Sequence, residues 1–82
     1  MNKTENDMQL LYIESFIQTD EIMHAVVYSE QQDEPIHLII CLEFLNTLEI
    51  SLIKPDKSIW VDGFYKYDNF KITKILAHSI QS

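Results

Sequence analysis

The feature that most constrains the fold is a segment of nine residues, 36–44, in which every second side chain is apolar. Those apolar positions are Ile36, Leu38, Ile40, Leu42 and Phe44. Successive side chains of a β-strand point to opposite faces of a sheet, so a spacing of two predicts a strand with one fully buried face. The segment therefore predicts that a β-sheet forms the centre of the fold.

Four other segments show weaker alternation and are also predicted to be strands. They are 22–29, 48–52, 59–67 and 70–77, and a helix over 70–80 is a less favoured interpretation of the last one. Polar clusters between the strands predict tight turns at 18–21, 30–35, 45–47, 54–58 and 68–69. Strands joined by such short turns must run antiparallel, because a parallel connection needs a crossover of about a dozen residues or more.

Residues 8–17 fit two interpretations. Their apolar side chains suit a helix, and Thr4, Asn6 and Asp7 ahead of them are suitable N-cap residues. With a period of two, the same apolar residues instead form the two faces of a strand. We predict a short helix for this segment.

Together these elements predict an α+β fold, in which a short N-terminal helix packs on a curved antiparallel sheet of about five strands. The alternative is an all-β small SH3-like barrel. The single glycine favours the open sheet, because a tightly curved barrel usually needs glycine kinks or bulges. A chain of 82 residues has room for one domain, which we place at 8–82 behind a flexible N-terminus at 1–7.

The charge of the chain is strongly acidic and unevenly distributed. Thirteen Asp and Glu residues stand against six Lys and no Arg, for a net charge of −7. Residues 1–53 hold ten of the carboxylates and one lysine, whereas residues 54–82 hold five lysines and three aspartates. This balance disfavours direct binding to nucleic acids or to anionic membranes, because both require clustered cations.

Several other classes of protein are also disfavoured. A single cysteine forms no intrachain disulfide, and no apolar run approaches the length of a membrane span or signal peptide, so we expect a cytoplasmic protein. His37 and Cys41 lie four residues apart, about 13 Å along a strand, which is too far for one metal ion. With one glycine there is no phosphate-binding loop. We therefore expect no cofactor, no metal site and no enzymatic activity.

The acidic turns carry our functional prediction. We expect a protein–protein interaction module that binds a basic partner, such as a nucleic-acid-binding protein or a nuclease complex, and inhibits or adapts it as a phosphate mimic. Anti-CRISPR-type inhibitors and toxin-immunity proteins are analogies. The candidate partner-binding residues are Asp20, Glu21, Glu30, Asp33, Glu34, Glu49, Trp60, Tyr65 and Tyr67. The alternatives are a small nucleic-acid- or ligand-binding barrel that uses an aromatic and lysine-rich face within 57–74, and a self-associating module, for example a homodimer.

Overall fold

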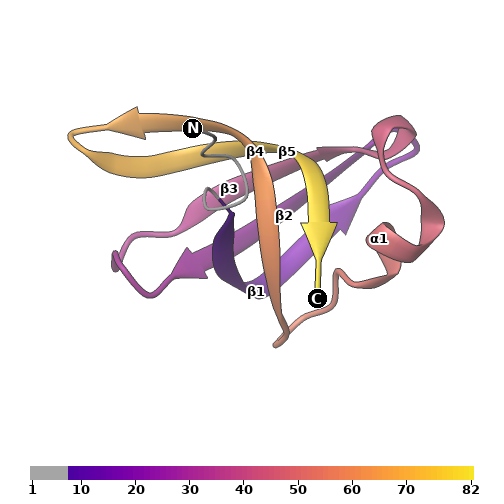
Figure 1. The fold of residues 1–82 in the computed structure, drawn as a ribbon, viewed down its shortest axis with the longest axis horizontal. Coiled ribbons are helices and arrows are strands. Elements are labelled where there is room, and N and C mark those ends of the chain that lie inside the picture. Colours follow the sequence, from indigo (N-terminus) through magenta and orange to yellow (C-terminus); the bar gives the residue numbers. More distant parts are fainter. Residues whose placement is uncertain (1–7) are drawn as a thin grey trace, which may run out of the picture.

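The computed structural model describes residues 8–82, and it consists mainly of β-structure. Five strands are interrupted by one 3₁₀ turn and one short helix (Figure 1). In chain order the elements are β1 (Gln9–Gln18), β2 (Ile22–Ser29), β3 (Ile36–Cys41), η2 (Leu42–Phe44), α1 (Thr47–Ser51), β4 (Ser58–Asp68) and β5 (Lys71–Gln81).

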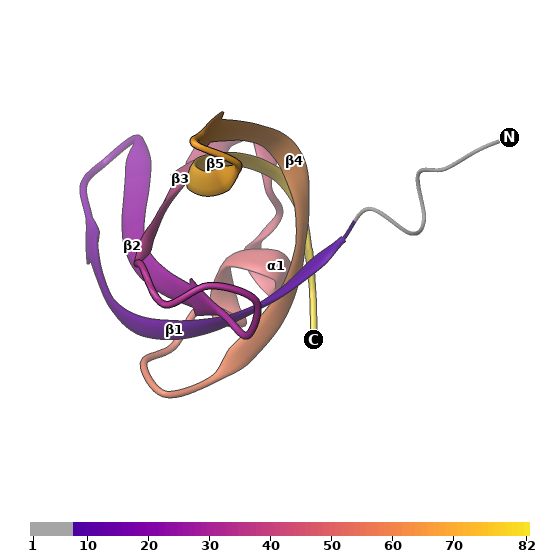
Figure 2. The ribbon, with the colours of Figure 1, turned by 90° about the vertical axis from the view of Figure 1, so that its left-hand side faces the viewer.

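The five strands form a closed barrel in the order β1-β2-β3-β5-β4, and β4 pairs back onto β1. Figure 2 shows this ring from one end. Every pairing is antiparallel except that of β3 with β5, which is parallel. The connection through α1 and β4 lies between those two strands in the chain, and it allows them to run in the same direction. This order and direction of strands is the topology of the OB barrel, a five-stranded Greek-key barrel that hosts many functions.

The core fills the barrel with the inward side chains of all five strands. On β3 these are Ile36, Leu38 and Ile40, each at most 1% exposed, as the alternation predicted. The prediction was wrong for the last three residues of 36–44, because the strand ends at Cys41 and η2 leaves Leu42 half-buried and Phe44 66% exposed. The predicted strands at 22–29, 59–67 and 70–77 are confirmed as β2, β4 and β5, and the last of these extends to Gln81. The helix considered over 70–80 is not present.

The prediction of an open sheet was wrong, and the all-β small barrel fits instead. Closure requires sharp bends, and bulges supply them: β1 carries an extra residue between Ile13 and Ser15, and β5 carries two extra residues, Thr73 and His78, where it pairs with β4. The bulge of β5 at His78 lies opposite Gly63 of β4, where a Cβ atom would stand 2.1 Å from the Leu76 carbonyl oxygen. One glycine is therefore enough, because bulges provide the remaining curvature.

The predicted N-terminal helix at 8–17 was also wrong, because this segment is β1. Leu11 and Ile13 are completely buried with a spacing of two, and Phe16 is partly buried against the same core. The step of three between Ile13 and Phe16 spans the bulge, which inserts one extra residue. In the sequence this step resembles the period of a helix.

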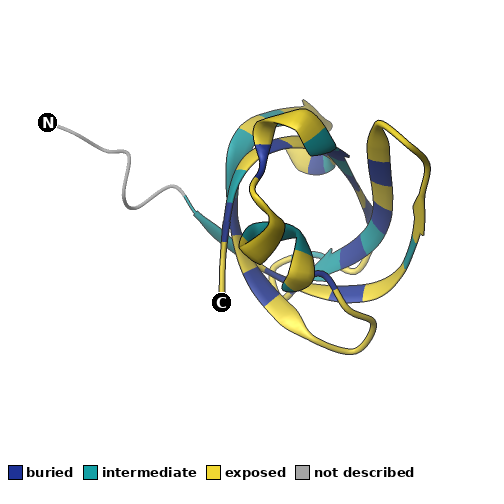
Figure 3. Cartoon of the chain, turned by 90° about the vertical axis from the view of Figure 1, so that its right-hand side faces the viewer, coloured by how far each residue is buried: buried dark blue, intermediate teal, exposed yellow. Residues whose placement is uncertain are grey.

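The segment predicted to be a strand at 48–52 instead contains α1. A capping box starts this helix: the Asn46 side chain accepts a hydrogen bond from the Glu49 backbone N–H at 2.8 Å, and Glu49 Oε1 accepts one from the Asn46 N–H at 3.0 Å. Leu45 and Ile53, which flank the helix, are buried in the core. Figure 3 shows α1 lying across one end of the barrel.

Two further expectations concern the N-terminus and membrane-spanning segments. The flexible N-terminus predicted at 1–7 lies outside the described residues. In residues 8–82, no helix has the length and apolar character needed to cross a membrane.

Candidate functional site

Two connections that are distant in the sequence lie at the end of the barrel opposite α1 (Figure 1). A hollow is present between them. The β2–β3 connection contributes Glu30, Asp33 and Glu34, and the β4–β5 hairpin contributes Tyr67 and Phe70. We call these five residues the acidic mouth. The volume of the hollow is about 590 Å³. Four of the nine predicted partner-binding residues are thus brought together here.

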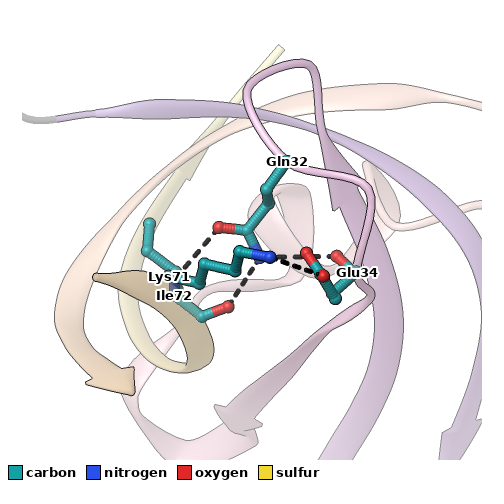
Figure 4. A network of polar contacts seen from close by, with 4 residues as sticks. All are labelled: Gln32, Glu34, Lys71 and Ile72. Atoms are coloured by element: carbon teal, nitrogen blue, oxygen red, sulfur yellow. Dashed lines mark hydrogen bonds and ion pairs between the residues drawn. The ribbon is translucent and has the colours of Figure 1, made fainter. Parts of the chain in front are cut away.

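The side-chain amide of Gln32 holds the β2–β3 connection against β5 through two hydrogen bonds to the backbone of Ile72 (Figure 4). Its side-chain Oε1 accepts a hydrogen bond from the Ile72 backbone N–H at 3.0 Å, and its Nε2 donates one to the Ile72 carbonyl at 2.8 Å. The amide side chain therefore pairs with both backbone groups of one residue, as a neighbouring strand would. Prediction from the sequence missed this role, because a lone glutamine in a turn carries no signal of it.

An ion pair closes the same contact. Lys71 Nζ lies 2.7 Å from Glu34 Oε2, and this is the one ion pair within residues 8–82. The hydrogen bond between the two groups lowers the pKa of the Glu34 carboxyl and raises the pKa of the Lys71 ammonium. Among the described residues, Glu30 and Asp33 have no ion-pair partner, so their negative charges face the mouth without a paired cation there.

Phe70 is the most unusual residue of the mouth. Its side chain is 100% exposed, and its backbone φ is 66°, in the left-handed region that bulky residues rarely adopt. Asn69 has a φ of 54°, so both residues of this two-residue hairpin loop are left-handed, which is the geometry that usually selects Asn-Gly. The sequence analysis placed Phe70 in a strand, because nothing in the sequence indicates a left-handed phenylalanine.

The remaining predicted residues lie in four other places. Trp60 is 42% exposed and lines an adjoining hollow of about 310 Å³, which shares Glu30 with the acidic mouth. Glu49 caps α1. Tyr65 is half-buried, and its hydroxyl donates a hydrogen bond to the Val61 carbonyl at 3.0 Å.

Asp20 and Glu21 lie at the far end of β2, away from the acidic mouth. They border a separate hollow of about 560 Å³ together with Glu43, and Ile22 beside them is 41% exposed. The predicted acidic residues therefore form two separate groups at opposite ends of the barrel and not one continuous surface.

A second surface lies on the outside of the barrel, and we call it the outer face. It consists of two rows of side chains that run in register across all five strands, and none of the ten residues is buried. The first row is Ile17, His24, Ile39, Leu76 and Phe64, and the second is Ser15, Val26, His37, Lys74 and Lys66. Neither row contains a carboxylate. The outer face is therefore apolar and cationic, in contrast to the acidic ends.

The aromatic and lysine-rich face predicted within 57–74 does not form one surface. Lys66 and Phe64 belong to the outer face, Tyr67 and Phe70 to the acidic mouth, and Trp60 to the adjoining hollow. The alternation of β4 causes this division, because Tyr67 faces the side of the strand opposite to Phe64 and Lys66, and Phe70 lies in the hairpin loop beyond the strand.

We predict that Phe70→Gly stabilises the protein, whereas Phe70→Ala does not. Glycine adopts a positive φ without steric cost, and the exposed ring contributes no packing. We expect an increase of about 0.5–1 kcal/mol in the free energy of unfolding for the glycine variant, measured by urea denaturation. Equal stability of the two variants would show that the backbone at Phe70 is not strained.

The Glu34–Lys71 pair predicts a specific dependence on pH. Because the pKa of Glu34 is lower in the folded chain than in the unfolded one, the pair stabilises the fold above the ordinary glutamate range and loses this effect as the pH falls through the folded pKa. Carbon NMR of the Glu34 carboxyl should show the low pKa at low salt. Lys71→Met should raise this pKa towards the ordinary range, and added salt should shrink the shift, because both groups are exposed. An unchanged Glu34 pKa in Lys71→Met would contradict the pairing.

Comparison of the chain with models of known protein families, with curated proteins and with solved structures finds no significant match.

Proposed function

We propose that this chain is a non-enzymatic binding module that captures a basic protein at the acidic mouth. One observation carries the proposal: carboxylates from one connection and a fully exposed aromatic ring from another converge on the same hollow. Acidic loops that served only for solubility would require neither an exposed ring nor a hollow between them.

The chemistry of the mouth suits an arginine or lysine side chain of the partner. Glu30 and Asp33 supply carboxylate oxygens that have no ion-pair partner within residues 8–82, and these accept hydrogen bonds from guanidinium or ammonium groups. The rings of Tyr67 and Phe70 offer π-faces at the same hollow, where a cation gains about 0.5–1 kcal/mol at an exposed site. Aromatic and cationic side chains are also the residues that dominate binding energy in protein interfaces.

The second acidic group, Asp20 and Glu21, serves as a comparison for the acidic mouth, because it carries the same kind of charge at another place. It lies at the opposite end of β2, so a partner of ordinary interface size that covers one group has no need to cover the other. Negative charge at this end instead contributes to the long-range attraction of a basic partner. Charge reversal at the two ends therefore separates specific docking from general attraction.

The test is a pull-down from a lysate of the source cells at low and high salt, with two matched charge-reversal variants. Each variant, Glu30→Lys/Asp33→Lys or Asp20→Lys/Glu21→Lys, replaces two carboxylates with two ammonium groups, so both change the net charge equally. We expect the wild type and the Asp20/Glu21 variant to retain a basic protein at low salt and to release it at high salt. The Glu30/Asp33 variant and Phe70→Ala should both lose this protein.

Two results would contradict the proposal. Equal loss of capture in both charge-reversal variants would mean that the net charge, and not the acidic mouth, attracts the partner. Retention in both variants would mean that the captured protein binds elsewhere. Circular dichroism of each variant, compared with the wild type, checks that the barrel is intact.

A second candidate function is favoured by the outer face, namely weak binding of single-stranded nucleic acid. Lys66 and Lys74 are direct cross-strand neighbours, and Phe64 provides a ring that is 69% exposed two residues away on the same strand. Cations beside aromatic rings hold phosphates and bases without selecting a sequence. OB barrels often bind oligonucleotides across strands 2 and 3, which also belong to this face. The net charge of −7 acts against such binding.

Fluorescence anisotropy of a labelled oligothymidylate of about 15 nucleotides tests this second function. If two lysines contact phosphates, the logarithm of affinity should fall with that of salt concentration with a slope of about −1.4. Lys66→Glu/Lys74→Glu should abolish binding, whereas the matched pair Lys54→Glu/Lys57→Glu, outside the outer face, should weaken it only slightly. No binding at low salt, or equal loss in both pairs, would exclude the outer face as a nucleic-acid site.

A further inference from the structure

Two histidines of the outer face converge on each other, although they are thirteen positions apart in the sequence. His24 on β2 and His37 on β3 are diagonal neighbours across the antiparallel pair. His24 Nε2 and His37 Nδ1 share a hydrogen bond of 2.9 Å, in which one ring nitrogen donates and the other accepts, and the ring centroids are 5.1 Å apart with the planes inclined at 46°. Both side chains are exposed, so a solvated ion can reach the two nitrogens.

We infer that this pair is a chelating site for a divalent transition-metal ion that favours tetragonal or octahedral geometry, namely Cu²⁺ or Ni²⁺. Bonds from imidazole nitrogen to such metals measure about 2.05 Å, by analogy with zinc. Two bonds of this length at a right angle separate the nitrogens by about 2.9 Å, whereas tetrahedral coordination requires about 3.3 Å. The hydrogen-bonded separation of 2.9 Å equals the right-angle distance, and the ion replaces that hydrogen bond once the donor histidine carries its proton on its other ring nitrogen, so that both facing nitrogens offer lone pairs.

The site has only these two protein ligands, and water completes the coordination. Within residues 8–82, no group of three or more potential metal ligands is present. The strand backbones hold both histidines in place, so the ion binds an arrangement that exists before it arrives. The ammonium of Lys74, the cross-strand neighbour of His37 on β5, is the nearest charge in the two rows and opposes a cation. The remaining neighbours in register are Ile17, Val26 and Ile39, which are apolar.

The experiment is calorimetric titration of the complete, tag-free chain with Ni²⁺, which avoids oxidation of the free Cys41 thiol. We expect one ion per chain, and His24→Ala or His37→Ala should each weaken binding by about tenfold or more. His78→Ala is the matched control, because His78 is the third histidine of the chain and stacks edge-on against Phe64, with ring centroids 5.2 Å apart. It should bind like the wild type.

Two further measurements keep the inference open to refutation. Ni²⁺ should raise the unfolding temperature of the wild type and His78→Ala but not of His24→Ala, since an ion that binds only the folded chain stabilises it. Lys74→Glu, which replaces the opposing ammonium with a carboxylate, should tighten binding. Unchanged affinity in His24→Ala and His37→Ala would overturn the site, and so would binding that is lost equally in His78→Ala.

Discussion

The pairing of β1 with two different strands is the interaction on which the rest of the structure depends. Its first residues, from Gln9 to Tyr12, pair with β4, while the stretch from Leu11 to Gln18 pairs with β2. The bulge after Ile13 bends the strand between these two partners. Because β1 pairs with β4 as well as with β2, neither β1 nor β4 is left as a free edge of the sheet. The inward side chains of all five strands then enclose one core.

Closure also determines where functional groups can lie. All connections between strands must emerge at the two ends of the barrel, and the acidic turns lie in those connections. The chain's charge is therefore concentrated at the ends, while the two rows of the outer face carry no carboxylate. A chain of strongly acidic composition thus presents three chemically distinct surfaces, and one of them is cationic.

The acidic mouth combines rigidity with local strain. Gln32 and the ion pair of Lys71 with Glu34 hold its two connections together through side chains, because no backbone ladder crosses that gap. Phe70 adopts a left-handed backbone conformation that glycine would adopt at a lower free-energy cost. Its ring is fully exposed, so no buried apolar surface compensates for this cost. Strained residues of this kind tend to occur where a binding surface, and not the fold, requires the side chain.

How much of this could be predicted depends on the range of the interactions involved. The strands at β2, β3, β4 and β5 follow from alternation, which is a property of neighbouring residues. The alternation of Leu48, Ile50 and Leu52 predicted a strand, and the capping box of Asn46 and Glu49, which starts α1 instead, was not identified from the sequence. For residues 8–17 the local signals were ambiguous, and pairing with β2 and β4 decided for a strand.

The same distinction applies to the candidate sites. The sequence by itself determined which segments form most of the strands and where the charged residues fall along the chain, because alternation and composition are local. Only the tertiary structure decided that the sheet closes, that Glu30 and Asp33 meet Phe70, and that His24 meets His37. Those contacts depend on bulges, registers and strand order, which are set when distant segments pair and bury a common core.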